Sequence, residues 1–261
     1  MTRTYLVTGS ASGIGKATAA KLRTDGHRVI GVDLKDADIE VDLATEDGRA
    51  GLVEQAQDLS GGVLHGVLAV AGVLLSASPS VAINHFGAVA TLEGLRPLLA
   101  AADQPRAAVV ASRAIIDEND AKLLDLIESG DEAAACAYAD SLAATSDAAG
   151  ASVVYTTSKL SLARWVRRNA PSDAWARCGI GLNAVAPGVI LSPMTIPVLE
   201  TEEGRATLDA HAPAPFGGPA ADPSAVANLL AWLTSTDNLF VTGQIIYIDG
   251  GAESIRRPEL I

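Results

Sequence analysis

A glycine-rich turn between an apolar segment and a helical segment is the feature that most constrains the fold. Thr4–Thr8 predicts a short strand, and Gly9, Gly13 and Gly15 follow it in the pattern Gly-x-x-x-Gly-x-Gly. Glycines at such a junction allow a tight turn, close approach of the backbone to a pyrophosphate group, and close packing of the next helix on the strand. The turn therefore predicts the first strand and helix of a dinucleotide-binding domain.

The rest of the chain repeats this alternation of strands and helices. Further strands are expected at Arg28–Asp33, Val67–Ala71, Ala107–Ala111, Ile180–Val185 and Gln244–Ile248. Helices are expected at about Gly15–Asp25, Asp47–Leu59, Val81–Ala101 and Asp222–Leu233, and around Tyr155 as far as Arg168. Such alternation predicts a parallel sheet of about seven strands with helices on both faces. Since 49% of the residues are hydrophobic and no linker or repeat interrupts the chain, we expect one Rossmann-like α/β domain over residues 1–261.

The strong negative charge of the chain excludes some classes of partner. The formal net charge is −12, so the chain should repel the phosphates of nucleic acids and anionic membrane surfaces. Backbone N–H groups at a helix N-terminus still allow it to bind a dinucleotide. No apolar run is long enough to span a bilayer, and a soluble cytoplasmic protein is expected. Cys136 and Cys178 have no metal-like spacing, so no metal site is expected.

The second expected strand ends in Asp33. A carboxylate at that point can accept hydrogen bonds from the ribose hydroxyls of the adenosine half of a dinucleotide, and it repels a 2′-phosphate. Asp33 therefore favours NAD over NADP. Lys35 is close enough in the sequence to leave NADP open as an alternative.

Tyr155 and Lys159 stand four residues apart in a segment expected to be helical, so their side chains share one face. A free tyrosine has a pKa of about 10, which is too high for a base at neutral pH. A nearby cation favours the phenolate and lowers that pKa. The pair could therefore remove the proton of an alcohol while a hydride leaves for a nicotinamide.

These motifs occur together with Ala71-Gly72, Asn84, the run Asn183-Ala-Val-Ala-Pro187-Gly188 and Asp249-Gly250-Gly251. In order and spacing they resemble the short-chain dehydrogenase/reductase family over essentially the whole chain. The resemblance implies a Rossmann-type fold, a nicotinamide dinucleotide cofactor and a small-molecule alcohol or ketone as substrate. It also implies a homodimer or a homotetramer.

The resemblance implies roles for individual residues as well. Tyr155 is expected to be the general acid and base, and Lys159 to hold the nicotinamide ribose and lower the pKa of Tyr155. Asn84 is expected to support a proton relay to the lysine. The expected catalytic residues are Tyr155, Lys159, Asn84 and Ser112. The expected cofactor-binding residues are Gly9, Ala11, Ser12, Gly13, Ile14, Gly15, Asp33, Asp42, Leu43, Val70, Ala71, Gly72, Tyr155, Lys159, Pro187, Gly188, Ile190 and Ser192.

The sequence departs from the family where the catalytic serine is expected. The family uses the second residue of a Ser-Ser pair after the strand, whereas this chain has Ser112 followed by Arg113. A displacement by one residue along a strand points a side chain to the opposite face. Either the strand end is irregular and Ser112 still reaches the substrate oxygen, or Arg113 acts there. An arginine could donate hydrogen bonds to a carbonyl or carboxylate, or it could spoil the site.

A second departure is the long segment between Ser112 and Tyr155. Residues 115–152 form an insertion whose apolar periodicity predicts two helices, Ala121–Glu128 and Asp131–Ala144. Together with Gln104-Pro105 and Arg257-Pro258, the insertion resembles the branch of the family that contains bacterial 3α-hydroxysteroid dehydrogenase/carbonyl reductase. In that branch the insertion lies near a subunit interface, so an altered dimer is expected.

The sequence as a whole predicts an NAD-dependent oxidoreductase that interconverts a secondary alcohol and a ketone. A hydroxysteroid or another bulky cyclic substrate is favoured, because segment 193–216 supplies apolar residues for a pocket. These residues are Met194, Ile196, Val198, Leu199, Leu208 and Phe216. A smaller alcohol, a quinone or a keto acid is an alternative substrate. A dinucleotide-binding or regulatory protein without catalysis is a second alternative, because Arg113 stands at the serine position.

Overall fold

The computed structural model describes residues 2–74, 77–145, 148–193 and 195–260. In this part of the chain, seven parallel strands form one sheet in the order β3-β2-β1-β4-β5-β6-β7. The strands are β1 (Thr4–Thr8), β2 (Arg28–Asp33), β3 (Ile39–Glu40), β4 (Gly66–Ala69), β5 (Arg106–Val110), β6 (Gly181–Pro187) and β7 (Ile245–Ile248). The predicted Rossmann-like α/β fold is therefore confirmed.

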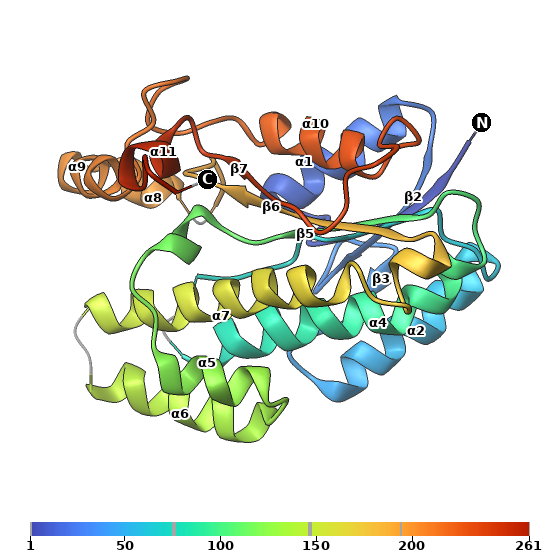
Figure 1. Ribbon diagram of the computed structural model, residues 1–261, viewed down its shortest axis with the longest axis horizontal. Coiled ribbons are helices and arrows are strands. Elements are labelled where there is room, and N and C mark those ends of the chain that lie inside the picture. Colours follow the sequence, from blue (N-terminus) through green and yellow to red (C-terminus); the bar gives the residue numbers. More distant parts are fainter. Residues whose placement is uncertain (1, 75–76, 146–147, 194, 261) are drawn as a thin grey trace.

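Helices cover both faces of the sheet (Figure 1). One face carries α1 (Gly13–Thr24) and α10 (Pro223–Leu233), and the other carries α2 (Glu46–Ser60), α4 (Ala88–Ala100) and α7 (Ala148–Asn169). A hydrophobic core forms between the sheet and the helices on each face. Along β1, Leu6 belongs to one core and Tyr5 and Val7 belong to the other, because side chains alternate across a strand.

The order of the chain reverses between β1 and β4, which are neighbours in the sheet although β2 and β3 lie between them in sequence. At such a point the connections that leave the two strands run to opposite faces and open a crevice. The Thr8 hydroxyl links the two strand ends, because it accepts hydrogen bonds from the N–H groups of Val70 and Ala71, both at 3.0 Å. The predicted cofactor-binding residues after β1 and β4 meet at this crevice.

The segment expected to be one helix at Val81–Ala101 is built differently. It begins earlier, with α3 (Ser78–Val81), and a π-helical turn at Ala82–Gly87 leads into α4. The turn lies tightly against the chain after β3, since a Cβ on Gly87 would lie 2.9 Å from the carbonyl oxygen of Leu43. Such π turns inside helices are frequent at functional sites, and Asn84 lies in this one.

The helical hairpin predicted in the insertion is present. It consists of α5 (Ala121–Glu128) and α6 (Glu132–Thr145), which pack with α3 and α7 around a small hydrophobic core (Figure 1). An ion pair of 2.6 Å between Arg49 Nη2 and Glu132 Oε1 ties the hairpin to α2. The last residues of the predicted insertion already belong to α7, which begins at Ala148 and continues through Tyr155.

Short helices gather beyond the carboxyl ends of the last two strands (Figure 1). They are α8 (Ile196–Leu199), α9 (Glu202–His211) and α11 (Ala252–Arg256). Thr201 caps α9 by accepting a hydrogen bond from the N–H group of Gly204 at 3.0 Å. Within the described ranges, no helix has both the length and the apolar character needed to cross a membrane.

Candidate active site

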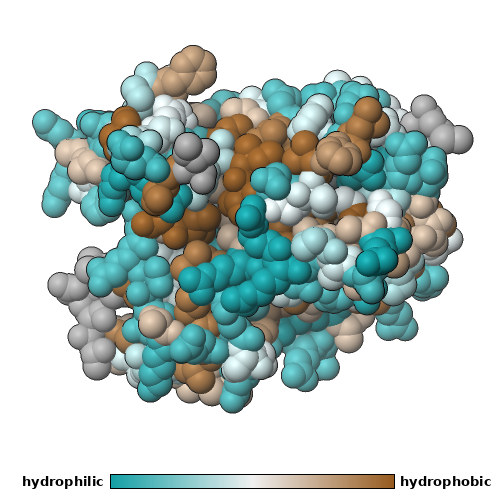
Figure 2. Space-filling view, viewed as in Figure 1, coloured by the Kyte–Doolittle hydropathy of each residue, from teal (hydrophilic) through white to brown (hydrophobic). Residues whose placement is uncertain are grey.

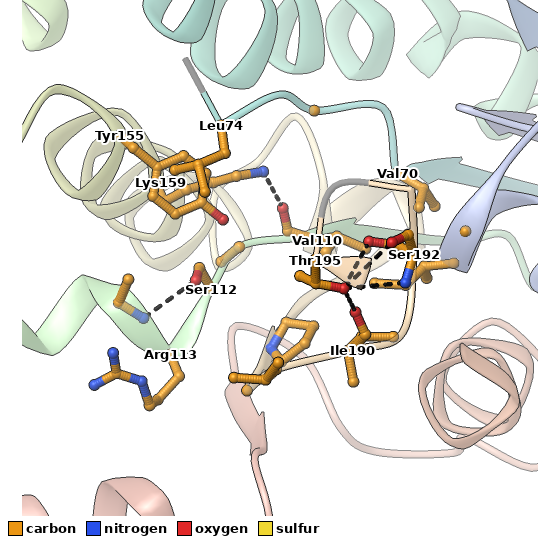
Figure 3. Close-up of a pocket in the computed structure, with 18 of the residues that line it drawn as sticks. Val70, Leu74, Val110, Ser112, Arg113, Tyr155, Lys159, Ile190, Ser192 and Thr195 are labelled. Carbon is orange, nitrogen blue, oxygen red and sulfur yellow. Dashed lines mark hydrogen bonds between the residues drawn. The ribbon is translucent and has the colours of Figure 1, made fainter. Parts of the chain in front are cut away.

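A cavity of about 420 Å³ opens at the carboxyl ends of β1, β4, β5 and β6. Its wall comes from the glycine-rich turn, the segments after β4, β5 and β6, and from α7 and α9 (Figure 3). The surface has an apolar hollow on this side, between α9 and α7 (Figure 2). The predicted site residues on the wall are Gly9, Ser12, Gly13, Ile14, Gly15, Val70, Ala71, Gly72, Ser112, Tyr155, Lys159, Pro187, Gly188, Ile190 and Ser192.

The glycine-rich turn presents backbone to the cavity because side chains do not fit there. Gly9 has a φ of +69°, and a Cβ on it would lie 3.1 Å from the Cα of Ala71. A Cβ on Gly15 would lie 2.0 Å from the carbonyl oxygen of Gly9. Ser12, the N-cap residue of α1, makes no side-chain capping bond, and the first turn of α1 holds no acidic residue. These features fit the pyrophosphate of a dinucleotide, which needs N–H groups at a helix N-terminus.

Replacement of Gly15 by Ala is expected to displace this turn, because the added methyl group meets backbone atoms that cannot rotate away. The dissociation constant for NADH, measured by fluorescence titration, should rise at least about tenfold, which corresponds to about 1.4 kcal/mol. Gly51→Ala is the matched control, since an added Cβ at Gly51 in α2 has no neighbour closer than 3.8 Å. Unchanged NADH binding by Gly15→Ala would show that the turn does not hold the cofactor.

Tyr155 and Lys159 lie on one face of α7, as predicted, and both line the cavity (Figure 3). Lys159 is buried, and its Nζ donates a hydrogen bond to the carbonyl oxygen of Val110 at 2.8 Å. Burial lowers the pKa of Lys159 to about 8. Gly72 leaves room for the ammonium group, since a Cβ there would lie 2.9 Å from Lys159 Nζ.

Burial and two neighbouring side chains shift the pKa of Tyr155. Burial raises this pKa above its ordinary value, and the Ser112 side chain and the positive charge of Arg113 counteract part of the rise. Lys159 is not among these causes, and the expectation that it lowers the pKa of Tyr155 stays a prediction.

The Ser112 side chain lies close enough to Tyr155 to lower the pKa of the phenol. β5 ends at Val110, and Ser112 caps a 3₁₀-helical turn at Arg113–Ile116 by accepting a backbone hydrogen bond at 3.1 Å. The alternation of side chains along a strand therefore no longer applies at Ser112. Of the two possibilities left open by the sequence, the irregular strand end is observed, and Arg113 points away from Tyr155 (Figure 3).

Asn84 is fully buried behind the cavity wall. Its amide donates hydrogen bonds to the carbonyl oxygen of Val73 at 2.9 Å and to Ser158 Oγ at 3.1 Å, and it accepts one from the N–H group of Val73 at 2.9 Å. A Cβ on Gly72 would lie 3.0 Å from Asn84 Oδ1 and 2.9 Å from Lys159 Nζ. Asn84 therefore holds the segment after β4 in place and lies close to Lys159.

The segment after β6 is held by a threonine that the sequence analysis misses. Thr195 Oγ1 donates a hydrogen bond to the carbonyl oxygen of Ile190 at 2.5 Å and accepts one from the N–H group of Ser192 at 3.1 Å (Figure 3). Its position three residues after Ser192 is the available signal, because Ser and Thr side chains often bond to the backbone at such short spacings. Gly188 packs on the segment after β7, since a Cβ there would lie 2.9 Å from the Cα of Asp249.

The predicted site residues that do not line the cavity are Ala11, Asp33, Asp42, Leu43 and Asn84. Asp33 accepts hydrogen bonds from the N–H groups of Ala11 at 2.9 Å and Leu34 at 2.8 Å. Asp42 accepts a backbone hydrogen bond at 2.9 Å, and Leu43 is buried. These acidic residues follow β2 and β3, on the other side of β1 from the Tyr155 region. The structure therefore places both outside the cavity wall, and Asp33 lies next to the glycine-rich turn.

Comparison with known proteins agrees with this geometry. The family model described as enoyl-(acyl carrier protein) reductase matches residues 122–253. The chain is 31% identical over 260 residues to the 3-alpha-hydroxysteroid dehydrogenase/carbonyl reductase of Comamonas testosteroni, with 97% of each chain covered. It belongs to the short-chain dehydrogenase/reductase family. The chain is therefore an oxidoreductase, and the resemblance predicted from its motifs is confirmed.

Two further proteins show how far the likeness to this family extends. The structure of the 3-alpha-hydroxysteroid dehydrogenase from Pseudomonas sp. B-0831 complexed with NADH has a TM-score of 0.89 and 34% identity, covering 99% of this chain and 100% of that chain. The cis-4-hydroxycyclohexanecarboxylate dehydrogenase of Sinomonas cyclohexanicum is 29% identical, with 97% of each chain covered.

In this short-chain dehydrogenase/reductase, segment 193–216 contributes fewer residues to the cavity wall than the sequence predicts. Leu208 and His211 of α9 line the cavity, but Ile196, Val198, Leu199 and Phe216 do not. Phe216 is 86% exposed, because the chain after α9 turns outward to solvent. Met194 lies outside the described residues. The apolar lining is therefore smaller than expected.

Proposed function

We propose that this short-chain dehydrogenase/reductase interconverts a secondary alcohol and a ketone with NAD(H). The observation that carries the proposal is that Tyr155, Ser112 and Lys159 line one cavity together with the glycine-rich turn. One cavity thus contains the Tyr155 hydroxyl, which can transfer a proton, and the Ser112 hydroxyl, which can hold the substrate oxygen. The same cavity has a place for a dinucleotide. The alternative of a protein that only binds the dinucleotide depends on Arg113 replacing the serine, and Ser112 beside Tyr155 weakens it.

Bound NAD would supply the carbon that accepts a hydride from the substrate. During oxidation, the Tyr155 oxygen takes the proton of the substrate hydroxyl while the carbinol carbon loses hydride and the C=O bond forms, and the positive charge of Lys159 would favour the phenolate that this step needs. Ser112 donates a hydrogen bond to the substrate oxygen. During reduction, Tyr155 returns the proton to that oxygen. Lys159 would hold the nicotinamide ribose, and Asn84 keeps the segment after β4 beside it.

We propose NAD as the cofactor because of the way in which Asp33 is held. Both carboxylate oxygens accept backbone hydrogen bonds, from Ala11 and Leu34, and these fix the negative charge at the end of β2. A fixed carboxylate at this place repels a 2′-phosphate, and its remaining lone pairs can accept hydrogen bonds from ribose hydroxyls.

Asp33→Asn should shift the cofactor preference toward NADP, because the substitution removes the charge and keeps the size of the side chain. The ratio of kcat/KM with NAD to kcat/KM with NADP should fall at least about tenfold, or about 1.4 kcal/mol. Asp25→Asn removes the same charge at the far end of α1, where it pairs with Lys21, and should leave the ratio unchanged. Equal use of both cofactors by the unmodified protein would contradict the proposal.

We propose a cyclic secondary alcohol as the substrate class, with a 3α-hydroxysteroid as the first candidate. The names of the relatives support this choice, since they describe dehydrogenases of hydroxysteroids and of a hydroxycyclohexanecarboxylate. Leu74, Pro193 and Leu208 offer apolar contacts for a ring system. The cavity volume of about 420 Å³ is in the range of small-molecule sites.

The test is NAD reduction by the purified protein with 3α-hydroxysteroids, cycloalkanols and open-chain secondary alcohols. Fast turnover of the cyclic alcohols is the expected result. Turnover restricted to small alcohols, or to quinones or keto acids assayed by NADH oxidation, would reject the substrate class and keep the reaction. Tight NADH binding without turnover of any substrate would reject the reaction and favour the binding-only alternative.

We also propose that the protein forms a homodimer or homotetramer. β7 is an edge strand of the sheet. In the segment between α10 and β7, the side chains of Leu239 and Phe240 are 80% and 98% exposed to solvent. Trp232 of α10 is 41% exposed, and the surface over α10 and β7 is apolar (Figure 2). Contiguous apolar surface of this kind is typical of protein interfaces. The cytoplasmic location stays a prediction.

A further inference from the structure

The cavity wall holds basic and no acidic side chains among the described residues, although the chain as a whole is acidic. The chain has 31 acidic and 19 basic residues. Among the described residues of the cavity wall, Arg113, Lys159 and His211 are basic, and none is Asp or Glu. Lys159 lies where the nicotinamide ribose is expected. The expected cofactor contacts therefore do not account for Arg113.

Arg113 is held by an ion pair that uses only part of its hydrogen-bonding capacity. The side chain is buried, and its Nη1 and Nη2 donate to Asp117 Oδ1 and Oδ2 at 3.0 Å and 2.6 Å. A guanidinium group has five N–H donors, so donors remain beyond this pair. Asp117 also faces Arg256, whose Nη2 lies 3.4 Å from its Oδ1. One carboxylate thus faces two guanidinium groups, and the cluster keeps a net positive charge.

This positive cluster lies on the substrate side of the cavity. In Figure 3, Arg113 lies beyond Ser112 on the side opposite Ser192, which belongs to the expected cofactor side. The second cation of the cluster, Arg256, donates a hydrogen bond to the carbonyl oxygen of His211 at 3.3 Å, and His211 lies on the cavity wall. A substrate whose reacting oxygen is held at Ser112 would therefore extend toward Arg113.

We propose that the substrate carries a carboxylate that Arg113 binds while its alcohol or ketone oxygen lies at Ser112 and Tyr155. This inference rests on the proposed function and narrows its substrate class. A guanidinium group recognises a carboxylate by two parallel hydrogen bonds, and shielding from water strengthens them. Asp117 orients the guanidinium group, and Arg256 offsets the charge of Asp117, so that Arg113 still attracts an anion.

Matched substrates test the proposal on the unmodified protein. 4-Hydroxycyclohexanecarboxylate, its methyl ester and its carboxamide share a ring and a secondary alcohol and differ in charge. The carboxylate should be oxidised with a kcat/KM at least about tenfold above that of either neutral compound. Equal values, or a preference for the neutral compounds, would overturn the carboxylate proposal and leave the proposed function intact.

Variants distinguish a role of Arg113 in substrate binding from a purely structural role of its ion pair with Asp117. Arg113→Met should lower the preference for the carboxylate over the ester at least about tenfold, mainly through KM, and Arg113→Lys should restore part of it. Asp117→Asn keeps the guanidinium group, so the preference should persist. Parallel losses on charged and neutral substrates in Arg113→Met and Asp117→Asn would overturn the proposal. Arg257→Met is the control, since Arg257 pairs with Glu253 at 2.8 Å outside the cavity wall.

Binding to the NADH complex gives a readout that does not depend on turnover. Calorimetry should show that cyclohexanecarboxylate binds the unmodified complex at least about tenfold more tightly than the Arg113→Met complex. Cyclohexanecarboxamide should not distinguish the two proteins. Such binding without oxidation of any alcohol would contradict the proposed function alone. Oxidation without this discrimination would contradict the carboxylate site alone.

Discussion

Tyr155→Phe is expected to lower kcat for NAD-linked alcohol oxidation by about 10²–10⁴-fold, the range in which general acid and base groups contribute. The substitution removes only the hydroxyl, and the ring still fills the same wall of the cavity. NADH binding should therefore change little, because the glycine-rich turn and Lys159 are untouched. Steady-state kinetics and an NADH titration on the same preparation measure both quantities.

The control for this variant is Tyr138→Phe. Tyr138 belongs to α6 in the insertion, outside the cavity wall, and its hydroxyl lies 3.5 Å from Asp120 Oδ2. The control should keep the unmodified kcat and KM. Full activity of Tyr155→Phe would remove Tyr155 from the mechanism, and a loss of NADH binding equal to the loss of turnover would point to damage to the fold.

Acidification from pH 7 to pH 4 is expected to remove about 3 kcal/mol of folding stability through His85. His85 is buried in the π-helical turn beside Asn84, and its Nδ1 pairs with Ser161 Oγ at 2.8 Å. Burial lowers the pKa of His85 from 6.5 to about 4. Between these values the unfolded chain binds a proton that the folded chain does not. The contribution is therefore present above pH 6.5 and is lost as the pH falls toward the folded pKa.

Urea unfolding of the unmodified protein and of His85→Gln at several pH values isolates this effect. His27 and His65 also have pKa values lowered by burial, so they give the unmodified protein a slope of the same sign. Subtracting the free energies of unfolding of the two proteins at each pH removes the contributions of His27 and His65, which both proteins share. The free energy of unfolding should fall less steeply with acid in His85→Gln, and His211→Gln at an exposed site serves as control. Parallel curves for His85→Gln and the unmodified protein would contradict the prediction.

Local patterns predicted most helices and strands correctly, because residue types at short spacings decide where such elements begin and end. Asp222 caps α10 by accepting a hydrogen bond from the N–H group of Ser224 at 2.8 Å, and Pro223 is the first helical residue. The turn at Ser129-Gly130 separates the two helices of the insertion, where Gly130 has a φ of +82°. The short β3 was missed, because two residues carry no periodicity.

The end of β5 shows where local patterns stop being sufficient. The sequence left open whether Ser112 or Arg113 takes the place of the catalytic serine beside Tyr155. The alternation of side chains along a strand, taken alone, favoured Arg113. The chain after β5 is held by α7 instead: Thr156 Oγ1 donates a hydrogen bond to a carbonyl oxygen 38 residues away, at 2.5 Å. Thr157 Oγ1 accepts one from an N–H group 37 residues away, at 2.9 Å. Contacts this distant in sequence determine which side chain faces the phenol.

The sequence by itself determined the family, the parallel sheet and most of the predicted residues that meet at the cavity, because these depend on glycines, apolar runs and the Tyr155–Lys159 spacing within single segments. Only the tertiary structure decided how these residues act on one another. Burial by elements from across the chain lowers the pKa of Lys159, and the turn after β5 brings Ser112 to Tyr155. Burial and distance arise only when separate segments pack together, so no pattern within one segment could have predicted them.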